Sequence, residues 1–143
     1  MSRAPKPITG RCLCGAVTYS ADAEPVVQAA CHCTDCQRQT GTTFSVVVGV
    51  DRDSFVVEGD SLSSYTTIGE DTKEAVHRQF CSACGSPIAS LPDLTPDLAF
   101  IKAGTLNDTS WLEPDMEIWC RSAQSWVTFD EENRGQFPRS VPT

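Results

Sequence analysis

The chain has 143 residues, 40% of them hydrophobic, which suits one globular domain with a modest core. A formal net charge of −8, with 11 basic residues that form no stripe or run, argues against a nucleic-acid-binding protein. No apolar run approaches the roughly 18 residues of a membrane span, and residues 1–7 lack the apolar stretch of a signal peptide. We therefore expect a single cytoplasmic domain over residues 1–143 that binds neither nucleic acid nor membrane.

Short β-prone segments separated by turn residues dominate the chain, which predicts an all-β domain. Residues 44–50 form a continuous run rich in valine, which is typical of a central strand. Residues 54–58 and 63–67 flank Gly59 and Asp60, so we expect a hairpin at this turn. The other predicted strands are residues 15–21, 26–30, 75–80, 87–90, 98–103 and 117–120.

Helix is limited to one or two turns at residues 34–40. Thr34 is the expected N-cap, and Gly41 is expected to end the helix. An N-cap at this position places Cys36 in the first helical turn, where free backbone N–H groups favour a thiolate.

Seven of the eight cysteines fall into three tight clusters whose spacing is typical of zinc ligands. In a reducing compartment such clusters serve metal binding, although an even number of cysteines also allows disulfides. Tetrahedral zinc takes four ligands, so the two pairs together make one closed, structural site, whose tight turn needs a positive φ at Gly85. The clusters are Cys12 and Cys14; Cys31, Cys33 and Cys36; and Cys81 and Cys84.

The cluster of three leaves one coordination position open, which indicates a catalytic or substrate-binding site. Three thiolates make zinc a weak Lewis acid, better suited to holding a substrate thiol as a thiolate than to making hydroxide. The cluster therefore points to sulfur chemistry rather than hydrolysis. A fourth ligand from His32, Asp35 or Cys120 would close the site instead. Alternation directs His32 away from its neighbours, and a lone strand cysteine such as Cys120 is usually a core residue.

The cysteine motifs and their neighbours resemble those of the glutathione-dependent formaldehyde-activating enzyme family, also called the GFA or CENP-V domain. The resemblance extends over about residues 9–138, which is therefore the expected core of the domain. The motifs are Gly10-Arg11-Cys12-Leu13-Cys14-Gly15, Cys31-His32-Cys33 with Cys36-Gln37-Arg38, and Phe80-Cys81 with Cys84-Gly85-Ser86.

The resemblance implies a zinc-stabilised β-tent of stacked antiparallel sheets with one or two short helical turns. It implies a carbon–sulfur lyase that combines formaldehyde with glutathione to give S-(hydroxymethyl)glutathione, so the expected partners are a small-molecule thiol and an aldehyde. Two zinc ions are implied as cofactors. The structural ion is matched to Cys12, Cys14, Cys81 and Cys84, and the catalytic ion to Cys31, Cys33 and Cys36.

Glutathione carries two carboxylates and is expected to need basic partners. Arg38, on the predicted helix beside the cluster of three, is the candidate for binding it, and Arg78, Lys102 and Arg121 are further candidates. His77 is a candidate proton carrier, although a histidine at such a position is more commonly a strand surface residue. Two other functions stay open: a non-catalytic zinc module that binds a protein partner, and an enzyme of the same fold that uses another thiol or electrophile.

Overall fold

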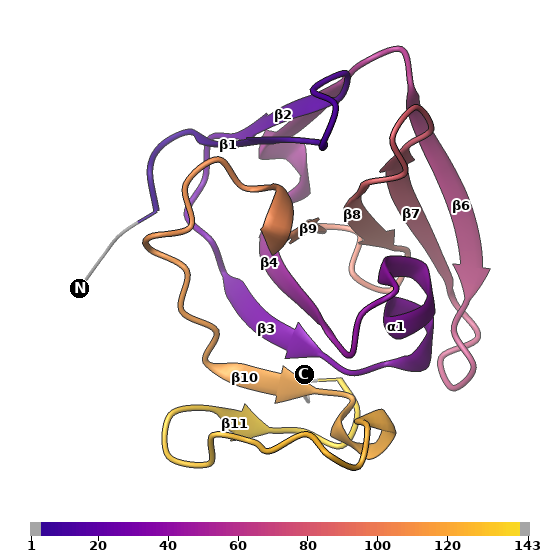
Figure 1. Ribbon diagram of the computed structural model, residues 1–143, viewed down its shortest axis with the longest axis vertical. Helices are drawn as coiled ribbons and strands as arrows, with labels where there is room; N and C mark the ends of the chain where they lie inside the picture. The colour runs from indigo at the N-terminus through magenta and orange to yellow at the C-terminus, as the bar shows by residue number, and fades with distance from the viewer. Residues whose placement is uncertain (1–3, 141–143) are drawn as a thin grey trace.

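Two β-sheets and one α-helix make up residues 4–140, the part of the chain that this computed structural model describes. The smaller sheet has the order β1-β2-β5, and the larger has the order β11-β10-β3-β4-β9-β8-β7-β6 (Figure 1). The expected all-β fold class is confirmed. The smaller sheet comprises β1 (Ile8–Arg11), β2 (Thr18–Ala21) and β5 (Phe55–Glu58). The larger comprises β3 (Val27–Cys31), β4 (Ser45–Asp51), β6 (Leu62–Ile68), β7 (Ala75–Cys81), β8 (Pro87–Pro92), β9 (Leu98–Lys102), β10 (Met116–Ile118) and β11 (Gly135–Gln136).

The helical segments are short. The α-helix is α1 (Thr34–Thr40), and the 3-10 turns are η1 (Arg52–Ser54), η2 (Ala103–Thr105) and η3 (Cys120–Ser122). No helix within residues 4–140 is long and apolar enough to cross a membrane.

Strand pairs are antiparallel except at β10, which runs parallel to both β3 and β11. The expectation of purely antiparallel sheets is therefore corrected at this edge. Residues 103–115 connect β9 to β10, and on the way they pass beside β1, where Leu106 bridges to Gly10. A connection of this length lets a strand enter the sheet parallel to its neighbour.

The larger sheet has two different faces because side chains alternate along each strand. Val48 of β4 and Ile101 of β9 point toward the smaller sheet and belong to the hydrophobic core. Their neighbours Val47 and Lys102, which pair with each other, point to the opposite face. The core therefore occupies one face of the larger sheet and leaves the other face for a cavity. The smaller sheet and its loops contribute Ile8, Cys12, Val17, Tyr19 and Ala21 to the core.

The hairpin expected at Gly59 and Asp60 is wrong, because β5 pairs with β2 in the smaller sheet whereas β6 pairs with β7 in the larger one. Phe55 and Val57 pack against the core, which keeps β5 in the smaller sheet. Gly59 makes the crossing with a φ of +141°, and a Cβ there would lie 2.2 Å from the carbonyl oxygen of Ala16. Gly59 and Asp60 do mark a turn, but this turn carries the chain from the smaller sheet to the larger one rather than back into the same sheet.

Two further strands differ from expectation. β1 has no predicted counterpart, since four residues that include a glycine give a weak strand signal. Its pairing with β2 requires that glycine, because a Cβ on Gly10 would lie 2.1 Å from the hydroxyl of Tyr19. β10 ends at Ile118, earlier than expected, because Trp119 has a φ of +57° that takes the chain into η3.

We expect Gly59→Ala to lower the free energy of unfolding by about 2–4 kcal/mol, because its backbone is strained for a side chain and the Cβ collides with Ala16. Gly104→Ala is the matched control, since a Cβ there meets no atom within 4 Å. Urea denaturation of both variants measures the difference. Equal midpoints for the two variants would contradict the crossing geometry.

Candidate metal centres

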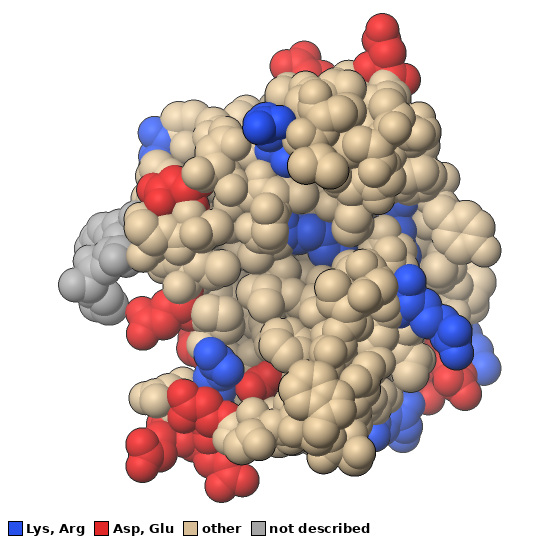
Figure 2. Space-filling model, viewed as in Figure 1, with Lys and Arg blue, Asp and Glu red and all other residues tan. Residues whose placement is uncertain are grey.

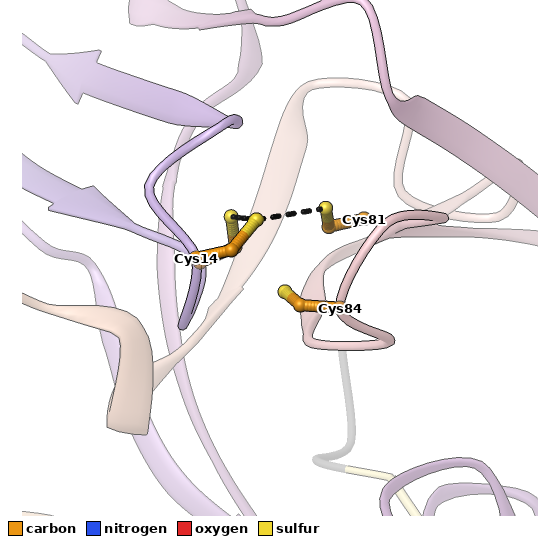
Figure 3. A group of neighbouring side chains, drawn as sticks. Cys14, Cys81 and Cys84 are labelled. Carbon is orange, nitrogen blue, oxygen red and sulfur yellow. Dashed lines mark hydrogen bonds between the residues drawn. The ribbon is translucent and has the colours of Figure 1, made fainter.

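Four cysteines from the two sheets converge on one point (Figure 3). Cys12 and Cys14 follow β1, while Cys81 ends β7 and Cys84 lies in the turn after it. Their Sγ atoms all lie within 4.8 Å of one another, with 3.6 Å between Cys12 and Cys14 and 3.8 Å between Cys14 and Cys81. Tetrahedral Zn–S bonds of about 2.3 Å place sulfurs about 3.8 Å apart. The four thiols therefore fit one zinc ion.

Each cysteine pair lies on a turn that is closed by a glycine N–H, three residues after Cys12 in one turn and four residues after Cys81 in the other. The N–H of Gly15 donates to the carbonyl of Cys12 at 3.2 Å, and the N–H of Gly85 donates to that of Cys81 at 2.7 Å. The two glycines have φ values of +82° and +83°, so the positive φ expected at Gly85 is confirmed. A side chain at either position would strain the turn that directs the thiols inward.

Ser86 connects these two turns. Its Oγ accepts a hydrogen bond from the N–H of Leu13 at 3.0 Å and lies 3.3 Å from Cys84 Sγ. Hydrogen bonds from its hydroxyl and backbone N–H lower the pKa of Cys84 to about 5. A thiol with this pKa is ionised at neutral pH, which is the form that binds metal.

The other three clustered cysteines surround the junction between β3 and α1. Cys31 ends β3, Cys33 precedes α1, and Cys36 lies in the first turn, with all three Sγ atoms within 4.8 Å of one another. The N-cap is Cys33 and not Thr34 as expected, because the Cys33 backbone is extended and its Sγ accepts a hydrogen bond from the Cys36 N–H at 3.2 Å. The helix ends at Gly41 as expected, with a φ of +69°.

These three thiols open into a cavity of about 230 Å³ on the face of the larger sheet that points away from the core. Strands β4, β7, β8 and β9 form its floor, and α1, the loop between β6 and β7, and the segment after β10 form its walls. Figure 2 shows basic side chains set deep among uncharged residues near the centre of the view. The floor residues are Val47, Val76, Arg78, Ser90, Pro92, Phe100 and Lys102.

Two buried cations contact Cys36. Arg78 is 4% exposed and Lys102 is 5% exposed, and their nitrogens Nη1 and Nζ lie 3.6 Å and 4.0 Å from Cys36 Sγ. Burying a cation is costly unless an anion neutralises it, so this arrangement favours a thiolate at Cys36. Hydrogen bonds from the two neighbouring thiols, and then the charges of these cations, hold the pKa of Cys36 well below its ordinary value.

The donor set of the cluster of three fits zinc with one open position. Hydrogen bonding to Cys33 and Cys36, together with burial, raises the pKa of Cys31, so in the absence of a metal the three thiols share protons. A divalent cation bound here would replace those protons and hold all three sulfurs as thiolates. All three cysteines line the cavity, so a ligand in the cavity lies beside the cluster.

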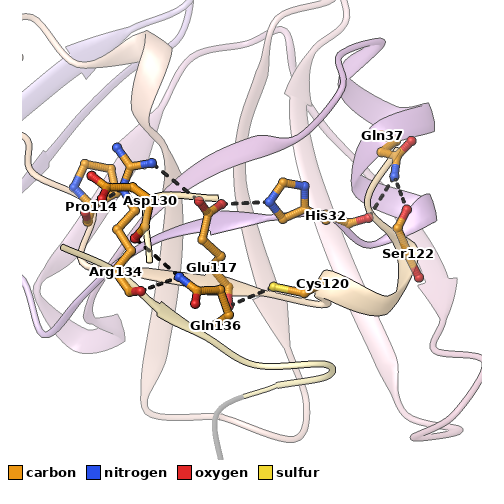
Figure 4. Close-up of polar contacts among 9 residues, drawn as sticks. All are labelled: His32, Gln37, Pro114, Glu117, Cys120, Ser122, Asp130, Arg134 and Gln136. Atoms are coloured by element: carbon orange, nitrogen blue, oxygen red, sulfur yellow. Dashed lines mark hydrogen bonds and ion pairs between the residues drawn. The ribbon is translucent and has the colours of Figure 1, made fainter. Parts of the chain in front are cut away.

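None of the residues considered as a fourth ligand joins the three thiols within residues 4–140. His32 is fully buried and bonds through Nε2 to Glu117 Oε1 at 2.8 Å, as Figure 4 shows. Cys120 Sγ donates to the carbonyl of Glu117 at 3.4 Å. Asp35 lines the cavity at the start of α1 without joining the cluster. The cluster therefore keeps its open position.

Of the four basic candidates from the sequence, Arg78, Lys102 and Arg121 line the cavity, and only Arg38, the first candidate, does not. Arg38 is exposed and lies outside the cavity, in a separate depression that Gln124 also lines. Arg121 does line the cavity, where it is paired with Asp71. His77 lies on β7 and bonds to a threonine of β6 and to Asp93 rather than to the thiols.

Sequence reasoning missed that Arg78 and Lys102 contact the thiols, and it missed Ser90 altogether. Lys102 carried a signal, because a lysine at the end of an apolar strand is expected to have a buried anionic partner. Arg78 and Ser90 meet only because β7 and β8 pair in one particular register, which the sequence does not reveal.

We expect a zinc content of two per chain, falling to one in both Cys14→Ser and Cys33→Ser. Cys14→Ser is expected to lower the melting temperature by about 10 °C, because it opens the crosslink between the sheets. Cys33→Ser is the matched variant with little expected change, since serine also caps helices well. Elemental analysis and thermal melting measure both effects. Equal destabilisation by the two substitutions would contradict the division into a structural and an open site.

Comparison with known proteins adds the family. A profile described as glutathione-dependent formaldehyde-activating enzyme matches residues 7–122. No match was found among curated proteins. The crystal structure of a Rhodobacter sphaeroides protein, a Northeast Structural Genomics target, is similar in fold, with a TM-score of 0.55 and 16% identity over 90% of this chain and 98% of that one. Since the profile covers most of the chain, the chain belongs to the glutathione-dependent formaldehyde-activating enzyme family.

Proposed function

We propose that the protein is a zinc-dependent carbon–sulfur lyase that forms and breaks the adduct of a thiol with an aldehyde, glutathione and formaldehyde in the first instance. The observation that carries this proposal is the open cluster of three thiols at the base of a cavity of about 230 Å³. A closed cluster would serve stability alone, whereas an open cluster beside a cavity provides room for a substrate ligand.

Each part of the cavity has a role in this reaction. Bound zinc would keep the substrate sulfur in its nucleophilic thiolate form. The three cysteines would hold the ion, while Arg78 and Lys102 balance the negative charge that collects around Cys36. The sulfur then bonds to the aldehyde carbon, and the aldehyde oxygen takes up one proton in place of the one that the thiol lost. The enclosing walls hold the two reactants together.

The same cavity also favours a second candidate, an enzyme of this fold that uses a thiol with fewer carboxylates. Four acidic residues line the cavity, and the chain as a whole carries a net charge of −8. Glutathione has two carboxylates, so the exposed charges among these that form no ion pair within residues 4–140, Glu70 and Glu74, repel it. The acidic residues are Asp35, Glu70, Asp71 and Glu74.

A non-catalytic zinc module is the weaker alternative. Such a module needs no cavity beside its metal and no buried cations against a ligand sulfur, and this chain has both. The proposed partners are thus small molecules rather than a protein, a nucleic acid or a membrane. The cytoplasm suits the proposal, because an open cluster of thiolates oxidises readily and needs a reducing compartment.

We expect the zinc-loaded protein to accelerate formation of S-(hydroxymethyl)glutathione from glutathione and formaldehyde at least tenfold over buffer, an effect of the size that positioning alone readily supplies. Exchange NMR measures the rate while both reactants are present. Cys36→Ser is expected to abolish the acceleration, whereas Cys120→Ser, outside the cluster, is expected to keep it. If the zinc-loaded protein does not accelerate formation of the adduct over buffer, the proposed reaction with these substrates is wrong.

Comparing thiols of different charge separates the two candidates. If the acidic residues at the cavity determine which thiol is preferred, then cysteamine, which has an ammonium group and no carboxylate, gives a higher kcat/KM than glutathione. Glu70→Gln combined with Glu74→Gln then raises kcat/KM for glutathione about threefold, as expected for exposed charges, and lowers it for cysteamine. A preference for glutathione that these substitutions leave unchanged would favour glutathione as the substrate.

A further inference from the structure

Ser90 is a buried hydroxyl that the protein itself does not satisfy. It is 6% exposed, lines the cavity, and its Oγ has no hydrogen-bond partner among residues 4–140. Buried polar groups are nearly always paired, so an unpaired one that faces a cavity points to a partner that enters the cavity.

The register of the sheet places this hydroxyl on the same face as the two buried cations, next to Arg78 and diagonal to Lys102. Ser90 of β8 pairs directly with Arg78 of β7 and with Phe100 of β9, so the three side chains share one face. Lys102 follows Phe100 by two residues and therefore lies on that face too. The floor of the cavity thus presents a row of hydrogen-bond donors from three adjacent strands, next to Cys36.

Both cations have donors left over. Among the described residues, the guanidinium of Arg78 donates to Thr67 Oγ1 at 3.0 Å and to Cys36 Sγ at 3.6 Å, which uses two of five N–H groups. The ammonium of Lys102 donates to Ser45 Oγ at 3.0 Å and toward Cys36 Sγ at 4.0 Å, which uses two of three. The remaining donors suit an oxygen that carries negative charge.

The acidic residues around the cavity do not cancel this positive charge. Glu70 and Glu74 are exposed, so water and salt screen them. Asp71 is paired with Arg121 and Arg139. Asp35 is half-buried at the start of α1, one residue from Cys36, and it is the acidic side chain that remains close to Arg78. Arg78 and Lys102 already share their charge with Cys36, so what the floor offers an incoming oxygen is their unused N–H donors.

We propose that Ser90, with Arg78 and Lys102, forms the site that receives the aldehyde oxygen, an inference that rests on the proposed function. When the substrate sulfur bonds to the aldehyde carbon, the π electrons of the carbonyl move to its oxygen, which becomes an alkoxide. The Ser90 hydroxyl and the free N–H groups donate to that oxygen as its charge develops. The alkoxide then takes one proton from water, which balances the one proton that the thiol released. The net reaction consumes only thiol and aldehyde.

A pair of ligands that differ by one oxygen tests this site. Thioacetate carries an oxygen on the carbon next to its sulfur, as the adduct does, whereas ethanethiol has the same chain without oxygen. We expect Ser90→Ala to weaken the binding of thioacetate to the zinc-loaded protein about tenfold, the effect of one hydrogen bond to a charged group, and that of ethanethiol less than twofold. Isothermal titration calorimetry measures both dissociation constants, with zinc content checked in each variant.

Ser64→Ala is the matched control, because Ser64 is exposed on β6 outside the cavity, and it is expected to change neither constant. An equal loss for both ligands in Ser90→Ala would mean that the hydroxyl only supports the fold, and no loss for either would mean that it meets only water. Both results overturn the proposal.

Kinetics supply a second readout. Ser90→Ala is expected to lower kcat about tenfold without raising the KM for the thiol, and Ser90→Thr, which keeps the hydroxyl, is expected to restore kcat. A raised KM with unchanged kcat overturns the assignment. The two hypotheses can fail separately. If Ser90→Ala weakens thioacetate binding selectively but the protein does not accelerate the glutathione reaction, the oxygen site stands and the proposed reaction is wrong. If the protein accelerates the reaction but Ser90→Ala causes no selective loss of thioacetate binding, the proposed reaction stands and the oxygen site is wrong.

Discussion

The fold depends on the junction that the four cysteines make between the two sheets. Each strand of the smaller sheet has four residues, and a sheet that short has too few hydrogen bonds and too little buried surface to be stable alone. A metal ion bound by Cys12 and Cys14 after β1 and by Cys81 and Cys84 after β7 would tie it to the larger sheet. The turn that carries Cys81 and Cys84 also joins β7 to β8, and a bulge between Gln79 and Phe80 then sets the pairing on which the cavity floor is built.

The cavity is a consequence of how the larger sheet uses its two faces. One face packs against the smaller sheet to form the core, so the other face can carry polar groups. Arg78 and Lys102 remain buried there because Cys36 supplies a negative sulfur within 3.6 Å and 4.0 Å of their nitrogens. The open cluster and the two cations thus depend on each other: without the thiolates the cations are unpaired, and without the cations three thiolates carry excess negative charge.

Local features of the sequence predicted local structure well. Clustered cysteines predicted both groups of thiols, and Gly41 and Gly85 marked turns that the structure contains, because ligand spacing and positive φ depend on neighbouring residues alone. The errors involve distant partners. Gly59 signals a turn, but whether the chain returns to the same sheet depends on which part of the core Phe55 and Val57 pack against. Likewise, Arg78 meets Ser90 through strand register, and Arg38 lies away from the cavity because α1 turns that side outward.

Two sets of contacts hold the wall of the cavity, one buried and one at the rim, and they respond differently to ionic strength. His32, directly after β3, bonds to Glu117 of β10, which also pairs with the part-exposed Arg134 at 3.4 Å, so a buried hydrogen bond joins β10 to the segment that carries the three thiols. At the rim, Asp71 pairs with Arg121 and Arg139, which are partly exposed. Salt screens exposed pairs far more than buried ones, so ionic strength acts on the mouth of the cavity while the thiols beneath it stay in place. The contacts at the mouth of the cavity and those around β10 therefore respond separately to salt.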